Sequence, residues 1–406
     1  MVLKRALEVI RTGIGMPALI SEDNYIKFLT DTAGVDLKMA RTFAIAGCLD
    51  TQIPGNSRNN AFGMFIVPLV LELAMNQGRD PKTGFLHGVE TKPFEEMESF
   101  DEFFDCFSKQ LKEIIGKIAE EHNILLTAQR ELFPDVIHGA LFEDGIKLGK
   151  DGLQRRLAFE NCSVVNCVGM INVVNSLAAI KKLVYDDKTV TAAQLKAAID
   201  SNWEGYEEVR EMCLGAPKYG NNIAYVDELA PLLWSTYADH VSSFKNIYGT
   251  PVMPTAISIT AHAPGGKLAG ATPDGRAAGD TFADGSISPV QGTDKNGPTS
   301  VFLSGMHIPQ EKFMATLLNM KFHTSALKKD EDLEKLGNLI KTYLLNGGKH
   351  VQFNVVNKET LEDAKVHKEE YADLIVRVAG YSAYFTALTS KVQDEIIERT
   401  AHECCV

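Results

Sequence analysis

The sequence predicts an α/β fold in which helices make up most of the chain. Apolar side chains recur at a helical spacing over long stretches, most clearly over residues 100–121. Strand-like composition is concentrated in the last third, at residues 350–356 and 374–378. Between these regions, residues 251–300 are rich in Gly, Pro, Thr and Asp, which predicts a long ordered loop region. Such loops in a compact domain tend to be functional.

Capping sequences mark two helices of the first half. Ser99 precedes Glu102 by three residues, and this capping box opens the first of these helices. Thr191 and Gln194 repeat the spacing ahead of a second apolar stripe. That stripe comprises Leu195, Ile199, Trp203 and Tyr206. Residues 168–185 are mostly apolar and predict a buried helix.

The last third alternates between helix and strand. A helix over residues 332–345 is predicted to end at Gly347, because glycine supplies the left-handed residue that ends many helices. The two strand-like segments flank a charged helix over residues 358–371. A strand, a helix and a strand at this spacing predict a parallel βαβ unit. A further helix is expected over residues 386–403.

Composition narrows the class of protein. The 406 residues carry a formal net charge of −12, which argues against non-specific nucleic-acid binding, since that needs a basic face. The most apolar stretch, residues 61–75, is interrupted by Pro68 and Glu72 and is shorter than the ~20 residues of a membrane span. The N-terminal residues lack the apolar region of a signal peptide. The seven cysteines form no CxxC pair, so we expect reduced thiols, no zinc site and a cytoplasmic protein.

The most specific motif surrounds Gly380. The glycine lies between the second strand-like segment and the last predicted helix, within the run Arg377-Val378-Ala379-Gly380-Tyr381-Ser382-Ala383-Tyr384-Phe385. A radical on Cα needs a planar, uncrowded centre, and glycine alone has no Cβ to crowd it or to keep a thiol away. The alternative to a radical site is that Gly380 simply forms a strand-to-helix turn with a positive φ, which is the usual role of an isolated glycine.

A thiol and a carboxylate stand two residues apart at Cys48 and Asp50, ahead of a Pro54-Gly55 turn that would hold both at a tip. A lone cysteine among apolar residues is usually a packed small hydrophobic side chain. A carboxylate in a poorly solvated pocket, by contrast, has a raised pKa and can act as general acid or base. The pair is therefore a candidate catalytic loop.

The run around Gly380 resembles the radical loop of the glycyl radical enzymes, and Gly47-Cys48-Leu49-Asp50 resembles their thiyl-radical loop. Further stretches that resemble this family are residues 13–19, 168–172, 176–182, 272–276, 283–289 and 350–356. The resemblance implies the C-terminal part of the family's ten-stranded barrel, surrounded by helices, with the two loops meeting inside. It also implies a barrel domain over residues 1–260 that carries the cysteine loop, and a glycine radical domain over residues 261–406.

The sequence of the cysteine loop also indicates which branch of the family this chain resembles. Pyruvate formate-lyase proper carries two adjacent cysteines here and uses both thiols, so that mechanism is disfavoured. The dehydratases, the C–N and C–S lyases and the arylacetate decarboxylases carry Gly-Cys-Val-Glu, and Asp50 replaces their Glu with a shorter reach. Family members are far longer, so we expect one half of a split enzyme, a fragment or a truncated product. Its strand edges would need a partner.

The resemblance implies a role for each site residue. Gly380 would store the radical, Cys48 would relay it to the substrate, and Asp50 would move a proton. The residues expected to support the radical loop are Arg377, Tyr381 and Phe385. No bound cofactor or metal is expected, because a separate radical S-adenosylmethionine enzyme would install the radical at Gly380. The other expected partners are a small-molecule substrate, an N-terminal partner chain and further copies of this chain, with no nucleic acid and no membrane.

Three functions remain open at this point. The first is dehydration or another C–X bond cleavage of a small organic substrate. The second is arylacetate decarboxylation or fumarate addition. The third is a non-catalytic, orphaned half of a split pyruvate formate-lyase-like enzyme.

Other chemistry-bearing residues are given simpler interpretations. Surface or core positions are expected for His122, His138 and His262, which do not form an HExxH spacing with Glu143 or any other residue. Arg276 is expected to be a solvated loop arginine. Glu160 and Asn161 are equally expected to face a pocket or to flank a helix. Cys404 and Cys405 are expected to be frayed thiols.

Overall fold

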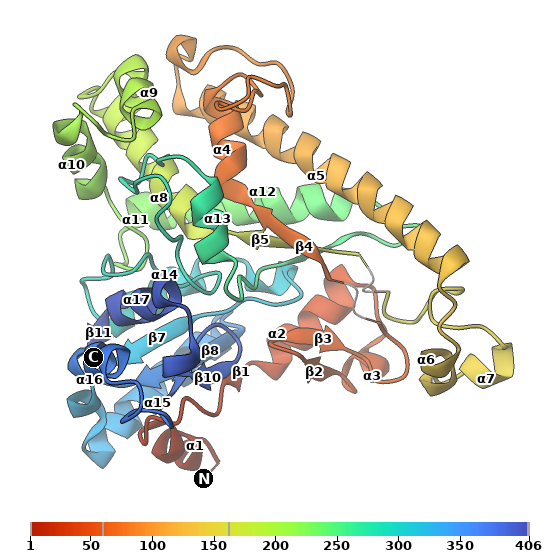
Figure 1. The fold of residues 1–406 in the computed structure, drawn as a ribbon. Helices are drawn as coiled ribbons and strands as arrows, with labels where there is room; N and C mark the ends of the chain where they lie inside the picture. Colours follow the sequence, from red (N-terminus) through yellow and green to blue (C-terminus); the bar gives the residue numbers. More distant parts are fainter. Residues whose placement is uncertain (1, 59–60, 161–162, 404–406) are drawn as a thin grey trace.

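The protein is rich in helices, and its short strands form several separate small sheets (Figure 1). A computed structural model describes residues 2–58, 61–160 and 163–403. The longer helices are α1 (Val2–Ile10), α2 (Glu22–Lys27), α4 (Val67–Met75), α5 (Phe100–Leu132), α6 (Val136–Leu141), α8 (Met170–Ala179), α9 (Ala192–Asp200), α10 (Glu207–Gly215), α12 (Leu229–Ser243), α13 (His262–Leu268), α14 (Pro298–Met306), α15 (Asp330–Leu345), α16 (Lys358–Val366) and α17 (Ser390–Glu398). The shorter helices are α3 (Leu37–Ala40), α7 (Gly145–Leu148) and α11 (Ala224–Asp227). None of the helices in the described residues is both long and apolar enough to cross a bilayer.

Two sheets and two hairpins carry the strands. Strands β4 (Ala61–Ile66), β5 (Val164–Val168) and β6 (Met253–Thr255) pair in parallel in that order. The second sheet has the order β1 (Leu19–Ile20), β8 (His350–Val355), β7 (Asn319–Phe322) and β11 (Ala401–His402). The hairpins are β2 (Ala44–Ala46) with β3 (Asp50–Gln52), and β9 (Ile375–Arg377) with β10 (Ser382–Tyr384).

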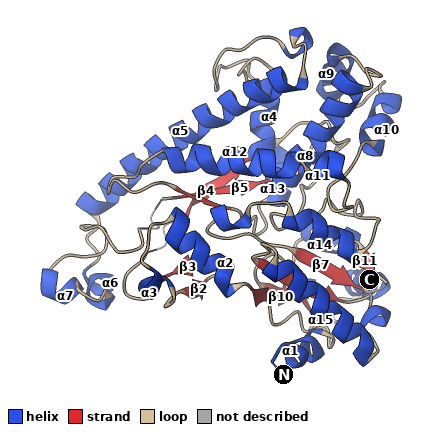
Figure 2. Ribbon diagram, turned by 180° about the vertical axis from the view of Figure 1, so that it is seen from behind, coloured by secondary structure: helices blue, strands red, loops and turns tan. Residues whose placement is uncertain are grey.

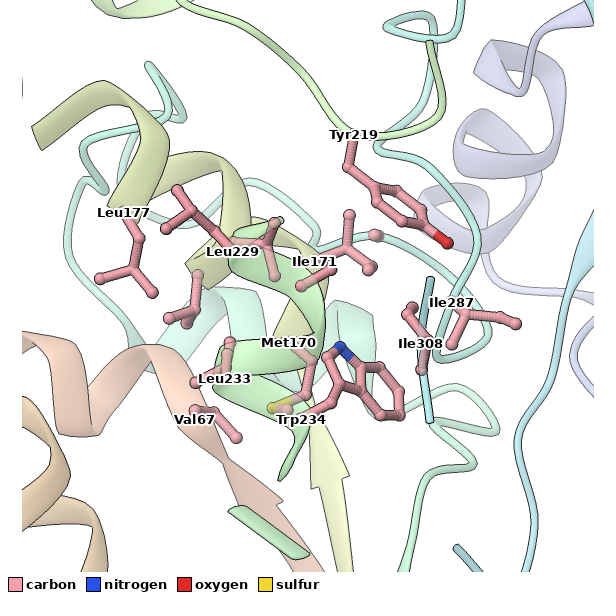
Figure 3. Packing of buried hydrophobic residues seen from close by; sticks show 14 of the residues in the cluster. Val67, Met170, Ile171, Leu177, Tyr219, Leu229, Leu233, Trp234, Ile287 and Ile308 are labelled. Atoms are coloured by element: carbon pink, nitrogen blue, oxygen red, sulfur yellow. The ribbon is translucent and has the colours of Figure 1, made fainter. Parts of the chain in front are cut away.

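The large apolar core extends from the helices that cover the three-stranded sheet to β7 and β8 of the second sheet. In the views of Figures 1 and 2, α5, α8 and α12 lie on one side of β4 and β5, and the β2–β3 hairpin lies on the other. Figure 3 shows Met170 of α8, Trp234 of α12 and Val67 of α4 packed into this core. All three side chains are buried, so burial of their apolar surface fixes these helices against the sheet.

Both predicted helix starts are confirmed. The Ser99 hydroxyl accepts a hydrogen bond from the Glu102 amide at 3.2 Å, and α5 continues to Leu132, beyond the predicted end. At α9, Thr191 and Gln194 form a reciprocal capping box. That helix ends at Asp200, before the last members of the predicted stripe.

The predicted parallel βαβ unit is wrong. Strand β8 pairs in parallel with β7, whereas β9 pairs antiparallel with β10 in a separate two-stranded sheet. The strand-like composition of β8 and β9 was interpreted correctly. Their pairing partners are β7 and β10, and the spacing of β8 and β9 along the sequence does not indicate these partners. The helix expected over residues 386–403 begins only at Ser390, so Gly380 lies in a β-hairpin and not in a strand-to-helix turn.

Arg276 is not the solvated loop arginine that the sequence predicts. It is buried, and its guanidinium donates to the carbonyls of Gly270, Ala277 and Asp280 at 2.5–2.9 Å. The same group lies 4.4 Å from the centroid of the Phe282 ring. Arg276 therefore ties together the loop that precedes the second sheet.

Replacement of Arg276 with Ala is expected to lower the free energy of unfolding by about 3 kcal/mol, because it leaves buried carbonyls without donors. Urea unfolding monitored by circular dichroism measures the change. Arg5→Ala is the control, since the Arg5 side chain is 82% exposed and pairs with Glu8 on the same helix. Equal unfolding midpoints for the two variants would contradict the prediction.

Candidate active site

Cys48 lies at the tip of the β2–β3 hairpin. The strands are in register at Ala46 and Asp50, so the turn consists of the three residues 47–49. Gly47 has a φ of +58°, a left-handed conformation that glycine adopts without strain. The Pro54-Gly55 turn therefore does not form the tip as expected. The tip is the turn that contains Cys48 itself, and Asp50 is the first residue of the following strand.

Gly380 lies at the tip of the second hairpin. Arg377 of β9 pairs with Ser382 of β10, and the Val378 amide donates to the Tyr381 carbonyl at 2.9 Å to close the turn. Gly380 has a φ of +84° and is buried. The chain thus needs glycine here for its backbone conformation, independently of any chemistry.

The two tips are in contact. A Cβ placed on Gly380 would overlap Cβ of Cys48 and would lie 3.0 Å from its Sγ and 3.3 Å from its Cα. Leu49 and Ala379, the neighbours of the two residues, pack in one apolar cluster with Ile257. Gly380 is buried, whereas Cys48 is partly exposed. The fold therefore brings together the two residues that the sequence singled out.

The surroundings keep the Cys48 thiol protonated. Burial raises its pKa above the ordinary value of 9.0, the charge of Asp50 raises it further, and Arg377 offsets part of this. A neutral S–H group can give up a hydrogen atom, whereas a thiolate has none to give. The electrostatics of the loop therefore suit hydrogen-atom transfer better than nucleophilic attack.

This pKa shift predicts slow alkylation of Cys48. At pH 8 the Cys48 peptide is expected to react with iodoacetamide several-fold more slowly than free cysteine, because less thiolate is present. Asp50→Asn removes a charge that raises the pKa and is expected to accelerate the reaction. Mass spectrometry of the Cys48 peptide over a pH series measures both rates. A Cys48 rate equal to that of free cysteine would refute the interpretation.

The three predicted support residues surround the Gly380 turn. Arg377 donates from its guanidinium to the Gly380 carbonyl at 3.1 Å and to Oε1 of Gln352 at 2.6 Å. Phe385 is fully buried in an apolar cluster beneath the hairpin, which also contains Val378. Tyr381 is partly buried at the edge of this cluster, and burial raises its pKa.

Sequence reasoning missed the polar residues that hold this hairpin from below. Asn354 accepts from the Arg377 amide at 2.7 Å and donates to its carbonyl at 2.8 Å. Asn319 and Arg399 donate to the Val378 carbonyl at 2.9 and 3.0 Å. The alternation of His350, Gln352 and Asn354 along β8 was the available signal, since three polar side chains on one face of a fully buried strand need partners.

The remaining candidates lie away from the two hairpin tips, and one of them, His262, lies 3.5 Å from the Glu395 carboxylate. Glu160 is buried and pairs with Arg58 at 2.7 Å, and its neighbour Asn161 lies outside the described residues, as do Cys404 and Cys405. His122 and His262 are buried core residues, and His138 is an exposed residue beside Asp135. Within the described ranges, no group of three or more His, Cys, Asp and Glu side chains is arranged to hold a metal ion.

Two large grooves lie away from the paired loops. One, of about 1160 Å³, runs along α5 beside Phe244. The other, of about 930 Å³, lies between α10 and α17 and is lined by Arg210, Lys218 and Glu398. Cys48 lines neither groove.

Comparison with known proteins agrees with the fold and with the paired loops. Residues 1–266 match the family described as pyruvate formate lyase-like, and residues 283–386 match the glycine radical family. The chain therefore belongs to the pyruvate formate-lyase-like glycyl radical enzymes. Its α/β fold is the predicted one, since its structural neighbours have the barrel fold of that family.

Individual relatives are similar over nearly all of this chain but over only half of their own. Trans-4-hydroxy-L-proline dehydratase of Clostridioides difficile is 35% identical over 98% of this chain and 50% of the relative. Indoleacetate decarboxylase of Tractidigestivibacter scatoligenes is 32% identical over 98% of this chain and 48% of the relative. The glycerol-bound B12-independent glycerol dehydratase from Clostridium butyricum superposes with a TM-score of 0.94 at 35% identity, over 99% of this chain and 51% of that structure.

Proposed function

We propose that this chain is the radical-bearing part of a glycyl radical lyase. The observation that carries the proposal is the contact between Cys48 and Gly380 at the tips of two hairpins. A radical at Cα of Gly380 would take the hydrogen atom of the Cys48 thiol, which forms a Cα–H bond and leaves a sulfur-centred radical. The sulfur radical would then take a hydrogen atom from the substrate, which restores the thiol and leaves a substrate radical.

Asp50 would move the proton that elimination or decarboxylation requires. It begins β3 two residues after Cys48, so it lies on the same loop as the proposed relay. Arg377, Tyr381 and Phe385 would hold the Gly380 turn in place. The proposed domain division assigns residues 1–260 to the barrel part and residues 261–406 to the glycine radical domain.

We propose dehydration or another C–X cleavage of a small organic substrate as the reaction. Relatives named as dehydratases for trans-4-hydroxy-L-proline and glycerol support it. Arylacetate decarboxylation is the second candidate, supported by the relative named indoleacetate decarboxylase. A non-catalytic half of a split enzyme is retained as an outcome of the test below, and a hydrocarbon supplied with fumarate in that test would reveal fumarate addition.

The partners are part of the proposal. A radical S-adenosylmethionine enzyme would install the radical at Gly380. This chain matches only half of the length of its relatives. A second polypeptide, equivalent to the half that this chain lacks, would complete the site around Cys48. Copies of this chain would also associate, and the substrate would be a small molecule.

Anaerobic EPR tests the proposal. The purified chain, with and without a candidate partner polypeptide, is incubated with an activating enzyme, S-adenosylmethionine and a reductant. The expected result is the doublet of a carbon-centred radical coupled to one α-hydrogen. A panel of diols, hydroxyproline and arylacetates then separates dehydration from decarboxylation. Radical formation without turnover of any substrate class would favour the non-catalytic function, and no radical under any condition would refute the proposal.

A further inference from the structure

A buried ionic cluster lies directly beneath the Gly380 hairpin. Arg399, the residue after the last turn of α17, has a side chain that is only 5% exposed. Its guanidinium donates to the Arg377 carbonyl at 3.1 Å and to the Val378 carbonyl at 3.0 Å. These two carbonyls lie at the end of β9, immediately before the turn that contains Gly380. One side chain thus bridges α17 and the hairpin.

Two carboxylates neutralise Arg399 and fix its orientation. Glu395 accepts two hydrogen bonds from it, at 2.7 Å from Nε and 2.8 Å from a terminal nitrogen. Asp284 lies 3.4 Å from the terminal nitrogen that also donates to Glu395. Burial alone would raise the pKa of Glu395, but the adjacent Arg399 charge outweighs it and holds that pKa below its usual value. The planar guanidinium is therefore locked in the one orientation that reaches both hairpin carbonyls.

The cluster continues to the other face of the hairpin. Asn319 donates to the carboxylate of Asp284 and also to the Val378 carbonyl, and its own side-chain carbonyl accepts from Gln352. Gln352 in turn accepts from Arg377, which holds the Gly380 carbonyl. The Gly380 turn is thus held from both sides by one connected network.

We propose that Arg399 is a positioning residue that sets the place of the Gly380 turn against Cys48. A catalytic effect of Arg399 rests on the function proposed above. Its effect on the position of the hairpin does not, because it can be measured in the protein before activation. The contact between the two tips tolerates little displacement, because hydrogen-atom transfer requires the sulfur and the Cα to remain adjacent. A misplacement on the order of 1 Å at a reacting pair costs up to about 100-fold in rate.

The test variant is Arg399→Lys. Lysine keeps the positive charge between Glu395 and Asp284, so the buried carboxylates stay neutralised. It lacks the planar fork, so it cannot donate to both carbonyls and both carboxylate oxygens at once. The matched control is Lys321→Met, because Lys321 is a buried cation whose side chain donates to the Ile396 and Ile397 carbonyls of α17.

Amide hydrogen exchange of the full chain, before any activation, is the first readout. Arg399→Lys is expected to accelerate exchange of the peptide covering residues 378–382 about tenfold, whereas Lys321→Met accelerates only the end of α17. An unchanged rate at residues 378–382 in Arg399→Lys would overturn the proposal. So would equal acceleration there in Lys321→Met, since general loosening of α17 would then explain the effect. This readout decides the proposal even if no radical is ever formed.

The second readout measures position in the activated protein. With cysteine deuterated at Cβ, electron–nuclear double resonance detects the dipolar coupling between the Gly380 radical and the Cys48 deuterons, which falls with the cube of their distance. Arg399→Lys is expected to weaken this coupling about twofold, as a displacement on the order of 1 Å would. Lys321→Met should leave it unchanged. A radical with wild-type coupling in Arg399→Lys would overturn the proposal, and absence of any radical in the wild type would overturn the proposed function alone.

Discussion

Gly380→Ala is expected to abolish the EPR doublet completely. The new methyl group would overlap Cβ of Cys48 and lie 3.0 Å from its sulfur, so the two hairpin tips would be forced apart. The substituted Cα would also be more crowded as a radical centre. In addition, the φ of +84° costs a residue with a Cβ about 1–2 kcal/mol. EPR after activation, with the free energy of unfolding from urea titration, measures both consequences.

Gly279→Ala separates the loss of the radical from simple backbone strain. Gly279 has a φ of +85°, nearly that of Gly380, and a Cβ there would meet nothing within 4 Å. Its replacement should cost a similar amount of strain energy and leave the doublet intact. A doublet that survives in Gly380→Ala, or one that is lost equally in both variants, would refute the assignment of the radical to Gly380.

Cys48→Ser is expected to retain the radical and lose turnover. The hydroxyl fits the space of the thiol, so the contact with Gly380 persists and the glycine is still activated. A serine O–H bond is much stronger than a cysteine S–H bond, so hydrogen transfer to the Gly380 radical becomes strongly unfavourable. Product formation from whichever substrate the wild type consumes should fall to background, while the spin count per chain stays at the wild-type level.

The control for this variant is Cys106→Ser. Cys106 is a buried cysteine whose pKa is also raised by burial, and it belongs to the helical core on α5. Its substitution should leave both the radical and turnover in place. Turnover by Cys48→Ser at more than a small fraction of the wild-type rate would exclude Cys48 as the relay.

Cys48, Gly380 and the neighbours Arg377, Tyr381 and Phe385 were predictable, but the polar network that holds the Gly380 hairpin was not. Cys48 and Gly380 were identified because the runs around them resemble the two loops of the glycyl radical enzymes, and the fold places the two residues in contact. The start of α5 was predictable because the Ser99 cap is local in sequence. Arg399, by contrast, follows an ordinary amphipathic helix, and nothing near it in the sequence indicates that it reaches the carbonyls of residues 377 and 378.

Strand pairing failed for the same physical reason. Strands of two or three residues carry too few side chains to specify a partner, so the pairing of β9 with β10 and of β1 with β8 is set by tertiary packing. Arg276 was misjudged because a loop arginine is usually solvated, and only the folded loop shows three backbone carbonyls converging on it.

The separation of Cys48 from its partners along the chain has a consequence for biosynthesis. The pairing of Leu19 with Val351 and the contact of Cys48 with Gly380 both join early and late parts of the chain. Contacts of such high sequence separation are slow to form, because the entropy of closing a long loop opposes them. During synthesis, Cys48 cannot contact Gly380 until the segment that carries Gly380 has left the ribosome. A nascent chain therefore lacks this contact until translation has passed Gly380.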